Sequence, residues 1–173
     1  LKKKSKILEK KQSFRNKTMA IILFGSSHDI YYEDKKENKK YKVFINYRES
    51  INNYHNNMIS YFKNLGYKID IYLSTNEMDE LAKNDIITDY NPTSYNFTGE
   101  DNINLHLVDS INLCLKSQKI YDICLITKFN LLFDDFKKYK FDFTKINLVS
   151  RLETPNLIDN NFYLLPYYYL PSI

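Results

Sequence analysis

The chain has 173 residues, of which 43% are hydrophobic and 27% charged, and a formal net charge of +4. This length and composition are typical of one soluble globular domain, and they exclude a disordered chain and a disulfide-rich scaffold. The charge is uneven, because residues 1–18 carry +7 and the remainder carries −3. A basic arm on a mildly acidic body argues against a nucleic-acid surface, so we interpret residues 1–18 as a flexible extension.

The first apolar run, residues 20–24, leads into Gly25-Ser26-Ser27 and predicts a buried strand with a polar tip. Met19 opens this pattern, and we assign residues 19–173 to a single α/β domain. The charged residues 29–41 are expected to form a solvated loop, because they contain a run of lysine and acidic side chains.

Residues 50–65 place apolar side chains at the spacing of one helical face and predict an amphipathic helix. Ser50 is expected to cap its start, and Gly66 to be the left-handed residue after its end. The next apolar strand, residues 67–73, leads into a second polar tip, Ser74-Thr75-Asn76.

Residues 77–90 are interpreted as one or two helical turns followed by a short strand. Residues 91–99 are expected to form a loop, because they combine a proline, a glycine and polar side chains. A second long helix then runs to about Gln118, with Thr98 or Asp101 as its N-cap.

The third apolar strand, residues 122–127, leads into Lys128-Phe129-Asn130, and two acidic residues, Asp134 and Asp135, follow. A further strand is expected at residues 146–150. Acidic side chains beyond a buried strand are one way to hold a divalent cation, and a solvated turn is the alternative.

Strands joined by helical crossovers run parallel, so their carboxyl ends gather along one edge of a sheet. The sequence therefore predicts a three-layer, Rossmann-like α/β fold with a mostly parallel sheet. Open sheets of this kind bind ligands along that edge, where the three polar tips converge. No phosphate-binding glycine motif is present; Gly25-Ser26-Ser27 is the nearest substitute, and a simple turn is the alternative.

Cys114 and Cys124 lie inside apolar patterns and are predicted to be buried free thiols. His28, His55 and His106 show no metal-ligand spacing, and the last two are expected on surface or half-buried helix faces. No apolar run is long enough to span a membrane and no signal-peptide pattern is present, so we expect no membrane partner and a cytoplasmic location.

Four segments, taken in order, resemble a known group: Ile21–Gly25, Ser50–Tyr54, Asp70–Thr75 and Tyr121–Phe133. They look like glycosyltransferase-like proteins of large DNA viruses and bacteria, which have a GT-A-like nucleotide-sugar domain. The similarity spans about residues 19–170. For a viral member of that group, the location would be the host cytoplasm.

The resemblance implies a GT-A-like donor half, a nucleotide-sugar as donor, and a glycan or protein as acceptor. The residues it places against the nucleotide are Gly25, Ser26, Ser27, Ser74, Thr75, Asn76 and, at the diphosphate, Lys128. Asn130 and Asp134 would lie near a divalent metal, Mn²⁺ or Mg²⁺. Members of the group usually show Arg-x-Asp where this chain has Lys128-Phe129-Asn130. The asparagine lacks the charge that holds a hard cation, which weakens the case for a metal.

Two other functions stay open. One is a non-catalytic binding domain derived from such an enzyme, which would contact a protein partner through the apolar, Tyr-rich residues 161–171. That segment needs a surface to pack on, and the group normally continues into an acceptor-binding half, so we expect a chain cut short there. The other is a nucleic-acid-associated protein that uses the basic residues 1–18.

Overall fold

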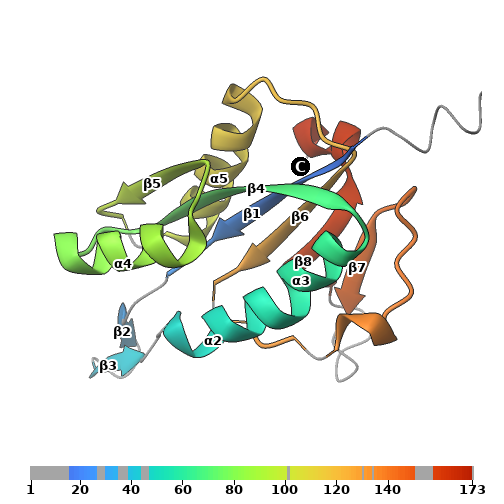
Figure 1. Cartoon of the computed structure of the whole chain (residues 1–173). Coiled ribbons are helices and arrows are strands. Elements are labelled where there is room, and N and C mark those ends of the chain that lie inside the picture. Colours follow the sequence, from blue (N-terminus) through green and yellow to red (C-terminus); the bar gives the residue numbers. More distant parts are fainter. Residues whose placement is uncertain are drawn as a thin grey trace, which may run out of the picture.

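The protein is seen in a computed structural model that describes residues 16–26, 30–34, 39–43, 47–100, 102–129, 131–133, 135–150 and 158–172. Six of the described strands form one sheet in the order β5-β4-β1-β6-β8-β7 (Figure 1). These strands are β1 (Lys17–Phe24), β4 (Tyr67–Asn76), β5 (Ser94–Thr98), β6 (Ile123–Lys128), β7 (Asn147–Ser150) and β8 (Ile158–Pro166). A separate two-stranded antiparallel sheet pairs β2 (Ile30–Asp34) with β3 (Lys39–Val43).

The large sheet is mostly parallel. β1 pairs in parallel with β4 on one side and with β6 on the other, and β4 pairs in parallel with β5. β8 runs antiparallel to β6, and β7 runs antiparallel to β8. The expectation of an α/β chain with an open, mostly parallel sheet is therefore confirmed.

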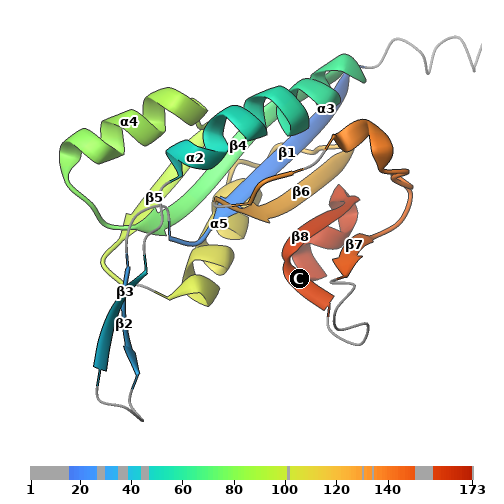
Figure 2. The same cartoon turned by 90° about the horizontal axis from the view of Figure 1, so that it is seen from below.

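Helices cover both faces of this sheet (Figures 1 and 2). One face carries α4 (Glu80–Tyr90) and a continuous helical run formed by α2 (Arg48–Asn53), the π-helix η1 (Tyr54–Ile59) and α3 (Ser60–Asn64). The other face carries α5 (Ile103–Lys116) and the 3₁₀ helix η3 (Tyr167–Ser172). The arrangement is three-layered, as the spacing of the apolar runs predicts.

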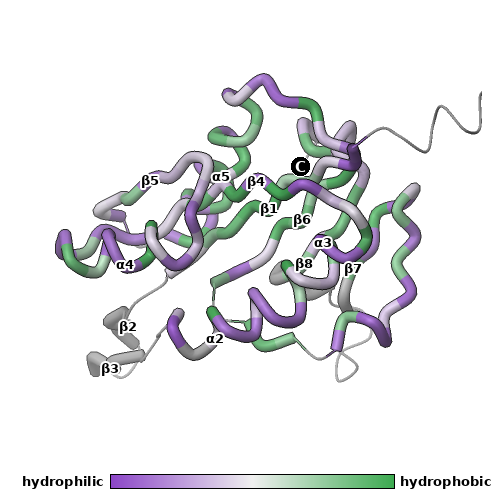
Figure 3. Tube along the Cα trace, in the orientation of Figure 1, coloured by the Kyte–Doolittle hydropathy of each residue, from purple (hydrophilic) through white to green (hydrophobic). Residues whose placement is uncertain are grey.

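The apolar side chains of the central strands alternate between the two cores, because successive residues of a strand point to opposite faces. The β1 side chains that pack under α2 and α3 are Met19, Ile21 and Leu23. The β1 side chains that pack under α5 are Ala20, Ile22 and Phe24. Figure 3 shows β1 and β6 as hydrophobic stretches at the centre of the fold. A strand buried on both faces reads as a continuous apolar run, which explains why these strands can be found from sequence.

The long helix begins earlier than expected. Tyr47 is its N-cap, so the prediction that Ser50 caps the helix is wrong. Ser50 lies one turn inside, where its single hydroxyl proton is shared between the Tyr47 carbonyl at 2.9 Å and the Phe129 carbonyl at 2.6 Å. Gly66 has a positive φ of 86° just after the helix end, as predicted for a left-handed residue.

Residues 77–99 differ most from expectation. The short strand expected at the end of residues 77–90 is helical, because α4 continues to Tyr90. Asp79 caps α4 by accepting from Ala82 N at 2.9 Å, and Asn91 ends it at a φ of 44°. The loop expected at residues 91–99 contains β5, whose pairing with β4 alone makes it an edge strand.

Two further expectations are corrected at the ends of elements. Residues 29–41, expected as a loop, contain β2 and the start of β3, which pair antiparallel. Neither Thr98 nor Asp101 is the N-cap of α5. The N-cap is Asn102, whose side chain accepts from Asn104 N at 3.0 Å.

The apolar C-terminal segment packs on the protein's own sheet. Leu164 and Leu165 of β8 and Leu170 of η3 are fully or almost fully buried, on the two faces of the sheet. Among the described residues of β8 and η3, Tyr168 is the most exposed large apolar side chain, at 66%. The surface that this segment needs is thus supplied within the chain.

Candidate functional site

The order of the strands defines a switch point between β1 and β6. The chain leaves β1 for β4 and β5 on one side and then returns to the other side of β1 to form β6. The first two crossovers run over the α2–α4 face, and the third runs over the opposite face through α5 (Figure 1). In open α/β sheets, the crevice outside the carboxyl ends of strands at such a point binds ligands.

The three polar tips meet at this edge. Phe24 of β1 lies opposite Ser74 of β4 and opposite Lys128 of β6, so the residues that follow all three strands share one rim. The predicted convergence of these tips is confirmed by the strand register. It depends on parallel pairing, which the helical crossovers between the strands impose.

Gly25 lies at the centre of the rim. Its φ is 99°, and a Cβ built there would lie 3.7 Å from Ile103 Cδ1 and 3.9 Å from Lys128 Cγ. The first turn of α5 therefore reaches the end of β1, beside the stem of Lys128. The positive end of the α5 dipole and the nearby lysine favour a negatively charged ligand, while the N–H groups of Asn104 and Leu105 are already bound by the Asn102 cap.

We expect Gly25→Ala to lower the free energy of unfolding by about 1–3 kcal/mol, because a side chain at this φ strains the backbone. The contacts around the added Cβ are of ordinary van der Waals length, so strain is the main cause. Gly99→Ala is the control, since its φ is not positive and its Cβ meets no atom within 4 Å. Urea unfolding of both variants measures the difference; equal stabilities would contradict this account.

The predicted nucleotide-binding residues differ in accessibility. Ser26, Asn76 and Lys128 are half-buried, whereas Gly25, Ser74 and Thr75 are buried. The Thr75 hydroxyl donates to Asn76 Oδ1 at 3.0 Å, which orients that amide at the strand end. At the tip of β4, Asn76 is thus the predicted residue that a ligand can reach in this conformation. Ser27, Asn130 and Asp134 lie outside the described residues.

Polar side chains of the long helix hold the main chain that leaves β6. Asn53 Oδ1 accepts from Phe133 N at 2.8 Å, and Asn53 Nδ2 donates to Phe133 O at 2.8 Å. Asn57 Nδ2 donates to the same carbonyl at 3.1 Å, and the Tyr54 hydroxyl donates to Lys128 O. Together with Ser50, these side chains fix the backbone at both ends of the predicted tip.

Sequence reasoning missed this anchoring set. The signal for it is a polar stripe at positions 50, 53 and 57, which have the spacing of one helix face and lie beside the apolar stripe. The helical run is a π-helix from Tyr54 to Ile59, a form that occurs frequently at functional sites. A tyrosine hydroxyl is protonated at neutral pH, and burial raises the pKa of Tyr54 further.

The histidine and cysteine expectations have mixed outcomes. His55 is half-buried as expected, but His106, in the second turn of α5, has 0% exposure, so its placement on an accessible helix face was wrong. Cys114 and Cys124 are buried free thiols, as predicted. Burial raises the pKa of both thiols, which keeps them protonated and unreactive.

Within the described parts of the chain, no group of three or more His, Cys, Asp or Glu side chains is placed to hold a metal ion. Asp135, one of the two predicted acids after β6, has a structural partner. Its Oδ1 accepts from Lys137 N at 3.0 Å and caps the 3₁₀ helix η2 (Phe136–Lys138).

The fold and its switch point thus define an α/β protein with an open, mostly parallel sheet and a rim of polar residues at the carboxyl ends of its strands. Comparisons with models of protein families, with curated proteins and with solved structures found no match. Among the described helices, none combines the length and the apolar character needed to cross a bilayer.

Proposed function

We propose that the chain binds a nucleotide-sugar outside the carboxyl ends of β1 and β6, and that it is the donor half of a glycosyltransferase. The observation that supports this most is the switch point between these strands, where Gly25, Lys128 and the start of α5 meet. The glycosyltransferase part of the proposal comes from the sequence resemblance. The location of the ligand comes from the topology.

The residues at the rim have complementary roles in this proposal. Ser26, which is half-buried, presents its main-chain groups to a ribose or phosphate, whereas the buried Gly25 allows the chain to turn at the end of β1. Lys128 and the positive end of the α5 dipole stabilise the charge of the diphosphate. Asn76 offers its amide to the nucleoside. A divalent cation, Mn²⁺ or Mg²⁺, would be held near Asn130 and Asp134, and a glycan or protein would be the acceptor.

The second candidate is a non-catalytic domain of the same fold. It is favoured by Lys128-Phe129-Asn130, where the resembling group carries Arg-x-Asp, because the asparagine provides no charge for a metal. The two candidates differ in one experiment on the full chain. Sugar transfer that appears only in Asn130→Asp identifies a degenerate enzyme, whereas transfer by the unchanged chain identifies an active one.

Nucleotide binding itself is tested by the melting temperature of the full chain. Nucleoside diphosphates and nucleotide-sugars should raise it, with and without Mn²⁺, because a ligand at 100 times its Kd stabilises the folded state by about 2.7 kcal/mol. Nucleosides without phosphate are the control and should have a smaller effect. An unchanged melting temperature across the panel rules out the proposed function.

A further inference from the structure

The contact between β5 and α5 is polar on its strand side. Ser94 of β5 lies opposite Tyr72 of β4, whose side chain belongs to the core under α5, and Asn96 lies opposite Ser74. Ser94, Asn96 and Thr98 therefore face α5, whereas the aromatic residues of β5 face α4. These half-buried polar side chains need hydrogen-bond partners between β5 and α5.

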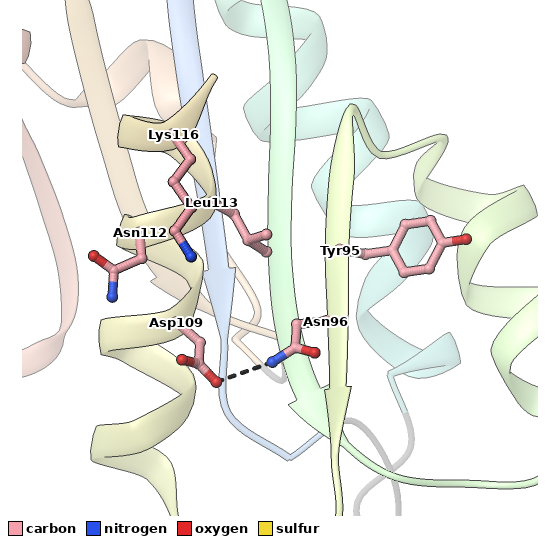
Figure 4. Close-up of a pocket in the computed structure, with 6 residues that line it drawn as sticks. All are labelled: Tyr95, Asn96, Asp109, Asn112, Leu113 and Lys116. Carbon is pink, nitrogen blue, oxygen red and sulfur yellow. Dashed lines mark hydrogen bonds between the residues drawn. The ribbon is translucent and has the colours of Figure 1, made fainter. Parts of the chain in front are cut away.

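The helix side of this contact is also polar, and a groove lies between the two elements (Figure 4). The groove has a volume of about 260 Å³, and the side chains of α5 that line it are Asp109, Asn112, Leu113 and Lys116. Tyr95 of β5 also lines the groove, although its ring projects to the other side of the strand in Figure 4. The four helix residues occupy one face of α5, with the spacing i, i+3, i+4 and i+7.

A hydrogen bond between the elements fixes the polar groups of the groove. Asn96 Nδ2 donates to Asp109 Oδ2 at 3.0 Å, and both residues are half-buried. This bond leaves the second carboxylate oxygen of Asp109 and the amide oxygen of Asn96 as acceptors. Lys116 forms no ion pair with any described residue and supplies donors at the same groove.

These groups select the chemistry of a ligand. One carboxylate is too few for a divalent cation, which takes several oxygen ligands, and the same carboxylate repels a phosphate. A hydroxyl group, in contrast, can donate to Asp109 and accept from Lys116 or Asn112. Leu113 adds an apolar surface for the C–H face of a ring. We propose that this groove binds one ring of a neutral sugar.

The size and place of the groove fit that proposal. Its volume is just below the range of roughly 300–1,000 Å³ that is typical of drug-sized ligands, which suits a single ring. Asp109 lies six residues along α5 from Ile103, about 9 Å at the rise of a helix. β4 separates β5 from β1 in the sheet. The groove is therefore distinct from the β1–β6 rim, and its function stands or falls separately from nucleotide binding.

Two-dimensional NMR of the full chain tests this site. Neutral hexoses, titrated one at a time, should cause saturable shifts of the side-chain amide signals of Asn96 and Asn112 and leave the Gly25 amide unchanged. The corresponding oligosaccharides form a second arm, which separates recognition of a free sugar from recognition of a glycan end.

Matched variants distinguish a role of these residues in sugar binding from a role in the stability of the fold. Asp109→Ala should weaken sugar binding at least about tenfold, the loss expected for a hydrogen bond to a charged group. Asn96→Ala should also weaken it, and Asn84→Ala, on exposed α4 surface, should not. Melting temperatures show that each variant is folded. Absence of saturable shifts, binding of free amino acids in place of sugars, or shifts centred on Gly25 would each overturn the proposal.

Discussion

Replacing Asn53 by alanine should lower the free energy of unfolding by about 2–3 kcal/mol, because it removes two hydrogen bonds and leaves the Phe133 N–H without its partner. The Phe133 carbonyl keeps one bond, from Asn57. Amide hydrogen exchange should therefore quicken at Phe133 more than in β6 itself. Urea unfolding measures the first effect, and exchange followed by NMR measures the second.

Asn52→Ala is the matched control for this prediction. Asn52 is the exposed neighbour of Asn53 on the same helix, so the change in helix propensity is the same in both variants. Asn53→Asp gives a second comparison, since a carboxylate still accepts from Phe133 N but cannot donate to Phe133 O. If Asn53→Ala is no less stable than Asn52→Ala, the side chain does not anchor the segment after β6.

The anchoring set also shows which part of the site lies beyond sequence reasoning. The strands that carry the tips can be predicted, because β1, β4 and β6 are apolar runs separated by helical segments. The contact between Asn53 and Phe133 joins residues 80 positions apart. Polar residues at helical spacing are common on exposed faces, so periodicity alone does not reveal such a contact.

Two of the elements that were predicted wrongly, α4 and β5, have a weak apolar pattern. β5 pairs on one side only and carries polar residues on its α5 face, so it lacks the apolar run that marks a central strand. In α4 only Ile86 and Tyr90 are buried, and this short apolar stripe gives a weak helical signal. The strand expected at residues 146–150 is present as β7, whereas β8, which lies inside the sheet, was expected only as an apolar segment.

The location of the candidate site could be predicted, because parallel pairing of three buried strands forces their tips together. The contact between Gly25 and Ile103, the first residue of α5, could not be predicted. The N-cap was expected at Thr98 or Asp101, and β5 was expected to be a loop. An error of a few residues at a helix start thus concealed the group that makes the rim favourable for an anion.

Lys128→Met should weaken the binding of a nucleoside diphosphate roughly 10- to 100-fold, because it removes a charge-assisted hydrogen bond while keeping a side chain of similar length. Isothermal titration calorimetry measures the affinity. The salt dependence of binding should also become flatter, since one charge no longer attracts the ligand.

Lys68→Met is the control for this charge. Lys68 is an exposed lysine near the start of β4, at the amino ends of the parallel strands. Its replacement by methionine changes the net charge by the same amount. A general electrostatic attraction to the whole protein would make the two variants equally weak, because long-range attraction depends on net charge. A specific site at the carboxyl ends of β1 and β6 requires that only Lys128→Met loses affinity. Equal losses would place the ligand elsewhere on the surface, even if the nucleotide binds.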